Sequence, residues 1–572
     1  MQEPAFVRPP LSRRAIARLV QLAGVIDVAT AVLPPRHGRM VTVLEFVPAA
    51  GILSARTATT VAGLLLIYVG AGLRRGKHRA WQVATWLSAA AAVLHLVKGL
   101  DYGAAALSLL LLVMLLATRD RFGALADRRN RWRALAALLG FAGAGFVLGL
   151  LEIAVRGNRL IGTPGVVDWA KESALGLIGL DGPVHFRHTW GAEAVSYTTG
   201  AYGLLAVAVA LVVLLRPGSR TPERTAADEI HLRHLLVRYG SADSLGYFAL
   251  RTDKSLIWAP DRTAVIAYRV VNGVSLASGD PVGSPAGWPA AIAAWLADAT
   301  AHGWTPAVLG CSRPGGRAYR RAGLDVVELG DEAVVDATTF TLDGRSMRGV
   351  RQAVNRIRRA GYTCGVTRQS DLDDERLRDV LHAADAFRDG HTERGFSMAL
   401  SRLGDPSDGD CLLVLCHDPT GRLRGLLQFV PWGPDGLSLD LMRADRSADN
   451  GLIEFMVATA LQSAAAAGVR RLSLNFAVLR SVFARAEELG AGPVLRLWHR
   501  LLKAASRLWQ IESLYRANAK YCPDWQPRYL CFPVARDLPR IAVAALSAEA
   551  FLPAVPAWSR RSRPTPAQAG AR

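Results

Sequence analysis

The chain has 572 residues, of which 51% are hydrophobic and 20% charged. This length exceeds what one compact core needs, and the apolar content excludes a wholly disordered chain. With 68 Lys and Arg against 48 Asp and Glu, the net charge of +20 predicts a polyanionic partner, either nucleic acid or anionic lipid.

Apolar runs of about 15 to 20 residues fill the first part of the chain, and each is long enough for a helix to cross a bilayer. Basic residues cluster at 13–18, 74–79 and 119–133, on the side that the positive-inside rule places in the cytoplasm. The sequence thus predicts a polytopic α-helical membrane domain over residues 1–216, with both ends in the cytoplasm. Its six expected spans are 15–33, 57–73, 81–97, 103–117, 133–153 and 197–215.

Ionisable residues at the first and third spans need an explanation. Asp27 lies in the first span, and His95 and Lys98 lie near the end of the third. Such groups are costly in hydrocarbon, so they either line a path for lipid or solute or pair with one another between helices. The first alternative leaves open a non-catalytic lipid-binding or transport protein.

A polar, proline-containing stretch at 217–229 is typical of a linker. After it, short apolar strands alternate with helices, which predicts a cytoplasmic α+β domain over residues 230–343. The expected strands are 255–258, 264–271, 274–277, 307–310 and 326–329, and the expected helices are 288–302 and 316–322.

Residues 344–361 predict a basic connecting helix, because they include six arginines and no acidic residue. Met347, Val350, Val354 and Ile357 make an apolar face, and arginines occupy the rest. Such a helix binds phosphates with salt-dependent affinity, or it is simply a solvated face. The candidate phosphate ligands are Arg345, Arg348, Arg351, Arg358 and Arg359.

A second α+β unit is predicted over residues 362–552, followed by a disordered tail at 553–572. The order of its elements is similar to that of the first unit, which suggests a duplicated domain. The expected strands are 411–416, 425–430, 437–442 and 471–476, and the expected helices are 377–388 and 452–467.

One short motif points to a different chemistry. Arg313–Ala318 fits the Arg-x-x-Gly-x-Ala pattern with which acyl-CoA transferases hold a pyrophosphate at a helix start. A membrane-bound, acyl-CoA-dependent GNAT acyltransferase is therefore an alternative. P-loop, CxxC and HExxH motifs do not occur in the sequence, so a P-loop nucleotidase, a structural zinc site and a zinc protease lose support.

Longer motifs carry a family resemblance. They are LSLDLMRADRSADNGLIEFM at 437–456, LSLNFA at 472–477 and LYRANAKYCPDWQPRYL at 514–530, supported by GDPVG at 279–283, FTLDGRSMRGVRQAVNR at 340–356 and ERGFSM at 393–398. Over roughly residues 230–550 the chain resembles the phosphatidylglycerol lysyltransferases, also known as aminoacyl-phosphatidylglycerol synthases or multiple peptide resistance factors. The stretch 474–552 is most similar to the actinobacterial type, in which this module can be fused to a lysyl-tRNA synthetase.

The resemblance implies a fold, an activity and partners. The cytoplasmic part is expected to contain tandem GNAT-like folds with the basic helix between them. The expected activity is transfer of an amino acid, lysine foremost, from aminoacyl-tRNA to a hydroxyl of phosphatidylglycerol or a related lipid at the cytoplasmic face of a bacterial cell membrane. Because this reaction exchanges one ester for another, no cofactor and no metal is expected.

Four residues are candidates for catalysis. Asp440 is assigned to the substrate ammonium or the attacking hydroxyl, and Arg443 to a phosphate or the oxyanion. Glu454 could be a second acid and Asn475 an oxyanion donor, although a surface ion pair or a strand-end contact would explain the same residues. The substrate-binding candidates include alternating aromatic and cationic groups suited to the terminal adenosine of tRNA. They are Glu393, Arg394, Tyr515, Arg516, Lys520, Tyr521 and Arg528.

Overall fold

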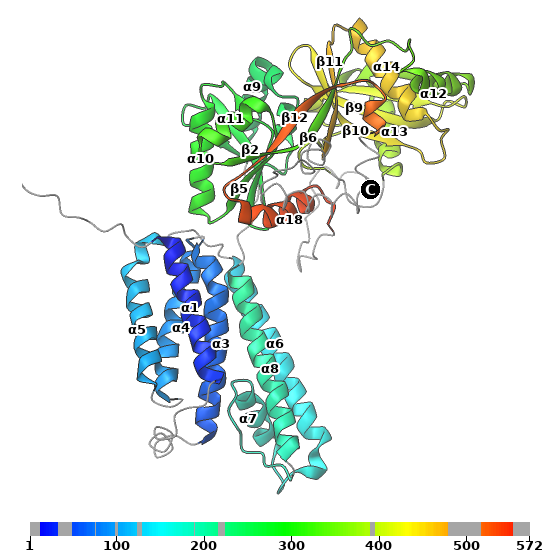
Figure 1. Ribbon diagram of the computed structural model, residues 1–572. Helices are drawn as coiled ribbons and strands as arrows, with labels where there is room; N and C mark the ends of the chain where they lie inside the picture. Colours follow the sequence, from blue (N-terminus) through cyan, green and yellow to red (C-terminus); the bar gives the residue numbers. More distant parts are fainter. Residues whose placement is uncertain are drawn as a thin grey trace, which may run out of the picture. The chain divides into compact units, whose positions relative to one another are not determined.

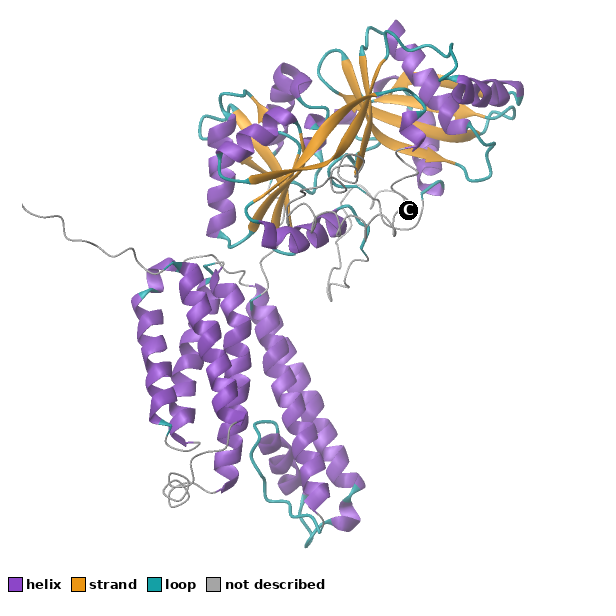
Figure 2. Cartoon of the chain, viewed as in Figure 1, coloured by secondary structure: helices purple, strands orange, loops and turns teal. Residues whose placement is uncertain are grey.

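In the computed structural model the chain divides into two compact units near residue 219, one made of helices and one built on a sheet (Figures 1 and 2). Each unit is described by itself. The residues that the structure describes are 12–32, 49–74, 76–97, 101–122, 129–187, 189–215, 224–388, 395–478 and 516–552.

In the described part of the helical unit, six long helices lie at the positions predicted for the spans. They are α1 (Arg13–Val32), α3 (Ala49–Arg74), α4 (His78–Val97), α5 (Tyr102–Ala117), α6 (Arg129–Val155) and α8 (Thr189–Leu214), with the shorter α7 (Val166–Gly176) between the last two. Among the described residues, three segments are long and apolar enough to cross a membrane: His78–Val97, Asn130–Val155 and Gly191–Leu214. The region therefore has membrane character, and the count of six spans stays a prediction.

Helices α1 and α3 approach closely through glycines, because a Cβ added to Gly24 would lie 2.5 Å from the carbonyl oxygen of Gly63. Near this contact, His95 Nε2 on α4 lies 2.8 Å from Asp27 Oδ1 on α1, and both side chains are buried. The two ionisable residues thus pair between helices, which was the second alternative for them. Lys98 lies outside the described residues.

Over its described residues, the second unit is built on one sheet of 12 strands. Its strand order is β1-β2-β3-β5-β12-β6-β11-β10-β9-β8-β7, with β4 paired to β2. The strands are β1 (Ser255–Trp258), β2 (Ala264–Val271), β3 (Val274–Ser278), β4 (Val282–Gly283), β5 (Thr305–Cys311), β6 (Asp325–Asp336), β7 (Thr363–Arg368), β8 (Leu412–His417), β9 (Leu423–Pro431), β10 (Gly436–Ala444), β11 (Arg471–Val478) and β12 (Asp524–Phe532).

The sheet repeats one motif in each half. In the first half, β2 and β3 are antiparallel and β3 is parallel to β5, with α10 (Trp288–Ala301) between them in sequence. In the second half, β9, β10 and β11 repeat this pattern with α14 (Leu452–Ala466). The duplication is therefore visible in topology. The halves also exchange strands: β6 of the first half pairs with β11, and the C-terminal β12 pairs with β5.

The remaining helices of this unit are α9 (Ala226–Tyr239), α11 (Arg313–Arg321), α12 (Arg348–Arg359), α13 (Asp374–Ala386) and α18 (Leu538–Ala548). Side chains accept from free N–H groups at several of their starts: Thr225 caps α9, Ser312 caps α11 and Asp373 caps α13. The apolar face of α12 is buried against α14 and the sheet, in a core that includes Val350, Val354 and Ile357. Arg345 precedes this helix, which begins at Arg348.

Candidate active site

Two parallel strands separate at the centre of the second half. β10 and β11 pair only at Gly436↔Arg471, Leu437↔Leu472 and Ser438↔Ser473. Beyond Ser438 and Ser473, β10 continues beside β9, and β11 continues beside β6. We call this separation the strand fork. Asp440 and Asn475 lie two residues past its last bonded pair, one on each strand.

Asp440 is an extra residue in β10. The pairing with β9 passes from Leu439↔Phe429 directly to Leu441↔Gln428, so Asp440 forms a bulge. Bulges re-aim a side chain and are frequent next to active sites. The carboxylate is half-buried, and its Oδ1 accepts a hydrogen bond of 2.6 Å from the backbone N–H of Leu400.

Asn475 lies in a bulge of β11. Pairing with β6 passes from Ser473↔Val334 to Phe476↔Glu332, so two residues of β11 oppose one of β6. Asn475 has φ of 72°, a left-handed conformation that Asn tolerates better than most residues. Asn518 holds the bulge, since its Nδ2 donates to the Leu474 carbonyl at 3.1 Å.

The side chain of Asn475 has an unusual feature. Its Oδ1 is buried and has no hydrogen-bond partner among the described residues. Since buried polar atoms are nearly always hydrogen-bonded, an orphan of this kind needs a reason. A substrate group that binds at the strand fork would supply the missing partner.

The other two catalytic candidates have partners from elsewhere in the unit. The guanidinium of Arg443 donates to the carbonyl of Ala384, near the end of α13. Glu454, in the first turn of α14, forms an ion pair of 2.6 Å with Lys520. Partial burial would raise the pKa of the Glu454 carboxyl, but its hydrogen bonds, including the one from Lys520, and the charges of Lys520 and Arg356 together outweigh burial, and the pKa lies below its ordinary value. Glu454 is therefore a carboxylate at neutral pH.

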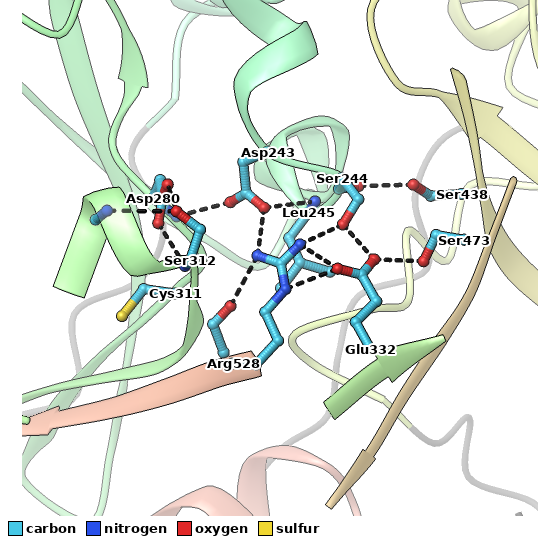
Figure 3. Close-up of polar contacts among 12 residues, drawn as sticks. Asp243, Ser244, Leu245, Asp280, Cys311, Ser312, Glu332, Ser438, Ser473 and Arg528 are labelled. Carbon is cyan, nitrogen blue, oxygen red and sulfur yellow. Dashed lines mark hydrogen bonds and ion pairs between the residues drawn. The ribbon is translucent and has the colours of Figure 1, made fainter. Parts of the chain in front are cut away.

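A buried polar cluster is hydrogen-bonded to the two strands where they separate (Figure 3). Arg528 of β12 donates to Glu332 of β6, with Nε 2.8 Å from Oε2, and to Asp243, with Nη1 2.6 Å from Oδ1. Glu332 also accepts from the hydroxyl of Ser473, and Ser438 Oγ donates to the Ser244 carbonyl at 2.9 Å. The last bonded pair before the fork, Ser438 and Ser473, is thus tied to the same cluster.

The charges in this cluster stabilise one another. Burial alone would lower the pKa of the Arg528 guanidinium, but the charges of Glu332 and Asp243 outweigh it and raise the pKa. Burial and the neighbouring charge of Asp243 raise the pKa of Asp280 to about 7. The guanidinium thus pairs with two carboxylates, Glu332 and Asp243, and the Asp280 backbone N–H donates to Asp243 Oδ2 at 2.8 Å.

Asp280 also occupies the start of α11. Its Oδ1 accepts from the backbone N–H of Ser312 at 2.8 Å, and its Oδ2 from the Ser312 hydroxyl. A Cβ on Gly315 would lie 1.9 Å from Asp280 Oδ1. The helix end that the Arg313–Ala318 motif offered to a pyrophosphate is filled by the protein's own carboxyl group. The acyl-CoA interpretation of that motif is wrong for this reason.

Two predicted substrate contacts need correction. Arg528 is wholly enclosed by the polar cluster, and Tyr521 packs in the hydrophobic core at 5% exposure. Burial raises the pKa of the Tyr521 hydroxyl. Neither side chain is accessible to an adenosine, so both residues stabilise the fold rather than bind substrate. Arg516 is exposed, and Glu393, Arg394 and Tyr515 lie outside the described residues.

The arginines of the basic helix differ in their surroundings. Arg351 is half-buried, and its Nη1 donates to the carbonyls of Leu342 and Gly344 at 2.5 and 3.1 Å. It therefore closes the turn before α12. The exposed members of the predicted set are Arg345, Arg348, Arg358 and Arg359.

Several residues of the site were missed by sequence reasoning. Asp243, Asp280 and Glu332 are far apart in the chain, and Asn518 lies inside a quoted motif without having been singled out. One signal was available: Asp331-Glu332 interrupts an apolar strand, and an acid inside such a strand needs a buried partner.

The family described as "Phosphatidylglycerol lysyltransferase, C-terminal" matches residues 233–532, which is more than half of the chain. The chain belongs to this family. The family resemblance of the motifs at 437–456, 472–477 and 514–530 is thereby confirmed.

Relatives named "Lysylphosphatidylglycerol biosynthesis bifunctional protein LysX" are similar over longer stretches. The protein from Mycobacterium avium is 52% identical over 364 residues, 64% of this chain and 31% of its own length. That from Mycobacterium sp. strain JLS is 44% identical over 533 residues, 90% of this chain and 46% of its own. The chain thus spans less than half the length of these curated relatives.

Among solved structures, "The structure of L-PGS from Bacillus licheniformis" matches with a TM-score of 0.51 and 22% identity, covering 59% of this chain and 99% of that one. This likeness concerns the fold alone: the matched part of this chain has the architecture of that protein.

Proposed function

We propose that this protein transfers lysine from lysyl-tRNA to a hydroxyl group of phosphatidylglycerol at the cytoplasmic face of a bacterial cell membrane. Family membership and the names of the relatives support this activity. In this proposal residues 1–216 cross the membrane six times, and residues 230–343 and 362–552 are two GNAT-like domains joined by the basic helix at 344–361.

The reaction is the exchange of one ester for another. The lipid hydroxyl oxygen attacks the carbonyl carbon of the lysyl ester, a tetrahedral oxyanion forms, and the bond to the tRNA ribose oxygen breaks. The proton lost by the lipid hydroxyl ends on the released ribose hydroxyl. The site therefore needs a group for this proton, donors for the oxyanion and an anion for the substrate ammonium.

The observation that carries the proposal is the strand fork with its orphaned amide. Asp440 supplies a carboxylate at one bulge, and Asn475 supplies a buried oxygen without a partner among the described residues at the other. We assign Asp440 to the substrate ammonium or the attacking hydroxyl, and Asn475 to a polar group of the same substrate. The oxygen and nitrogen of the Asn475 amide can exchange places by a flip, because they are assigned from their hydrogen bonds. A donor group on the substrate would therefore face the amide oxygen, and an acceptor such as the oxyanion would face the amide nitrogen.

Three further groups complete the assignment. Arg443 would bind a phosphate or the oxyanion, and the paired Glu454 and Lys520 would bind polar groups at the end of the aminoacyl chain. The exposed arginines of α12 would bind phosphates of the tRNA. Each of these roles is part of the proposal.

The test uses membranes that contain the full chain, labelled lysine, alanine or arginine, tRNA and the matching synthetases, with thin-layer chromatography of the lipids. We expect a labelled lysyl lipid that disappears when ribonuclease is added. A labelled lipid that resists ribonuclease, or none with any of the amino acids, would contradict the proposal.

In the same assay Asp440→Ala should reduce transfer at least 100-fold, since positioned acids and bases contribute about 10² to 10⁴ to rates. Asp449→Ala is the matched control, because Asp449 is an exposed acid in the loop that follows β10. Normal transfer by the Asp440 variant would remove this residue from the site.

A further inference from the structure

One face of α11 forms a pocket away from the strand fork. Arg313, Arg317 and Arg320 follow at intervals of four and three residues, so they share one side of the helix. Together with Gly316 of the same helix, Val326 of β6 and Tyr529 of β12, they line a pocket of about 260 Å³. This space has room for a group of the size of a phosphate.

The pocket is positively charged and lacks an internal counter-ion. No carboxylate lies within ion-pair distance of Arg313, Arg317 or Arg320 among the residues that the structure describes, and none lines the pocket. Arg313, Arg317 and Arg320 are exposed to solvent, whereas the buried Arg528 is paired with Glu332 and Asp243. Three like charges on one helix face repel each other, so an anion between them is stabilised.

The donor geometry favours a phosphate. A guanidinium presents parallel N–H groups that match two phosphate oxygens, and three arginines line one pocket here. The backbone N–H groups at the start of α11 are not needed for this, because Ser312 and Asp280 already bind that end. The anion would be bound by side chains along the helix.

The surroundings favour RNA over a lipid surface. A helix that lies on a membrane inserts an apolar face, but no large hydrophobic side chain of α11 is exposed, and Tyr319 is fully buried. The half-buried Tyr529 instead places an aromatic ring beside the arginines. Aromatic rings and arginines in one groove are typical of contacts to nucleic acid.

We propose that this pocket binds a backbone phosphodiester of the tRNA, as a contact separate from α12. The proposal rests on the proposed function, in which an aminoacyl-tRNA is the donor. A second phosphate contact on the first half of the sheet would fix the orientation of the tRNA, which a single basic helix leaves free to rotate.

The test measures binding of fluorescently labelled, uncharged tRNA to the full chain in detergent micelles at several salt concentrations. The double variant Arg317→Ala/Arg320→Ala should bind about tenfold more weakly, and its salt slope should fall by about one for each phosphate that the variant no longer binds. Arg321→Ala is the matched control, because Arg321 is exposed on the same helix and does not line the pocket.

Kinetics distinguish the source of the phosphate. The double variant should raise KM for lysyl-tRNA, with kcat and the KM for phosphatidylglycerol in mixed micelles unchanged. A rise in the KM for phosphatidylglycerol alone would show that the pocket binds lipid, and the proposal would be wrong. If the double variant binds tRNA as tightly as Arg321→Ala does, the pocket is not a tRNA contact, and the proposed function is unaffected. If the wild-type protein does not bind tRNA, both the pocket proposal and the proposed function are wrong.

Discussion

Arg528 shows how burial changes the meaning of a residue. In the sequence it ends a run of aromatic and cationic groups that suits RNA, but its guanidinium is enclosed between Glu332 and Asp243. Truncating one member of a buried ion pair leaves the other charge in a poorly solvated place without a partner. A substitution of Arg528 is therefore expected to lower the stability of the protein rather than its affinity for substrate.

We expect Arg528→Leu to lower the free energy of unfolding by about 3–5 kcal/mol, the usual cost of leaving a buried charge unpaired. The free energy of unfolding is measured by urea titration of the full chain in detergent, with tryptophan fluorescence as the signal. Arg321→Leu changes an exposed arginine and should stay within about 0.5 kcal/mol of the wild type. A stable Arg528 variant with a raised KM for lysyl-tRNA would restore the substrate-contact interpretation.

At the scale of elements, the two bulges decide where the functional groups of β10 and β11 point. A regular strand alternates its side chains between faces, and one extra residue re-aims the side chain at the bulge. In β11 the bulge requires a positive φ at Asn475, a conformation that glycine adopts without strain. Backbone and amide roles of this residue can therefore be separated by substitution.

Asn475→Gly should keep the bulge and the fold but abolish most transfer, because it removes only the amide. Asn475→Ala should lose the same activity and also about 1 kcal/mol of stability, since a Cβ is strained at this φ. Lipid-transfer rates and urea midpoints of both variants provide the comparison. Full activity of Asn475→Gly would mean that only the backbone shape matters.

At the scale of the whole sheet unit, the exchange of β6 and β12 joins the two halves. β12 lies between β5 and β6 in the middle of the sheet, and it supplies Arg528 to the buried cluster. Neither half therefore has a complete sheet without a strand from the other. Such an arrangement favours unfolding of both halves as one cooperative unit.

A chain ending at residue 515 lacks β12, so we expect it to lose the folded sheet unit altogether. Limited proteolysis in detergent should then cut throughout residues 224–478. A chain ending at residue 552 keeps β12 and α18 and is the control, with protection equal to that of the full chain. Selective protection of residues 362–478 in the shorter chain would contradict the coupling.

Sequence reasoning was accurate where apolar runs were uninterrupted. β1 and β2 match the predicted ranges 255–258 and 264–271, and α13 and α14 agree within a few residues. It failed at polar strands. β6 extends over Asp325–Asp336 although only 326–329 was expected, and β12 was missed because Pro527 and Arg528 break its apolar pattern. Both lie at the sheet centre, where partners on other strands satisfy their polar groups.

The sequence by itself determined the helical and α+β parts, most of their apolar helices and strands, and the family, because periodicity and motifs are local properties of the chain. It also placed Asp440 and Arg443 at the end of one strand and Asn475 on the next, whereas Asp440 and Asn475 lie in bulges in the middle of β10 and β11. Only the tertiary structure decided that Arg528 pairs with Glu332, 196 residues away, that Asp280 fills the start of α11, and that the arginines of α11 meet Tyr529. Contacts between residues so distant in sequence depend on the register of strands from both halves, which no local pattern encodes.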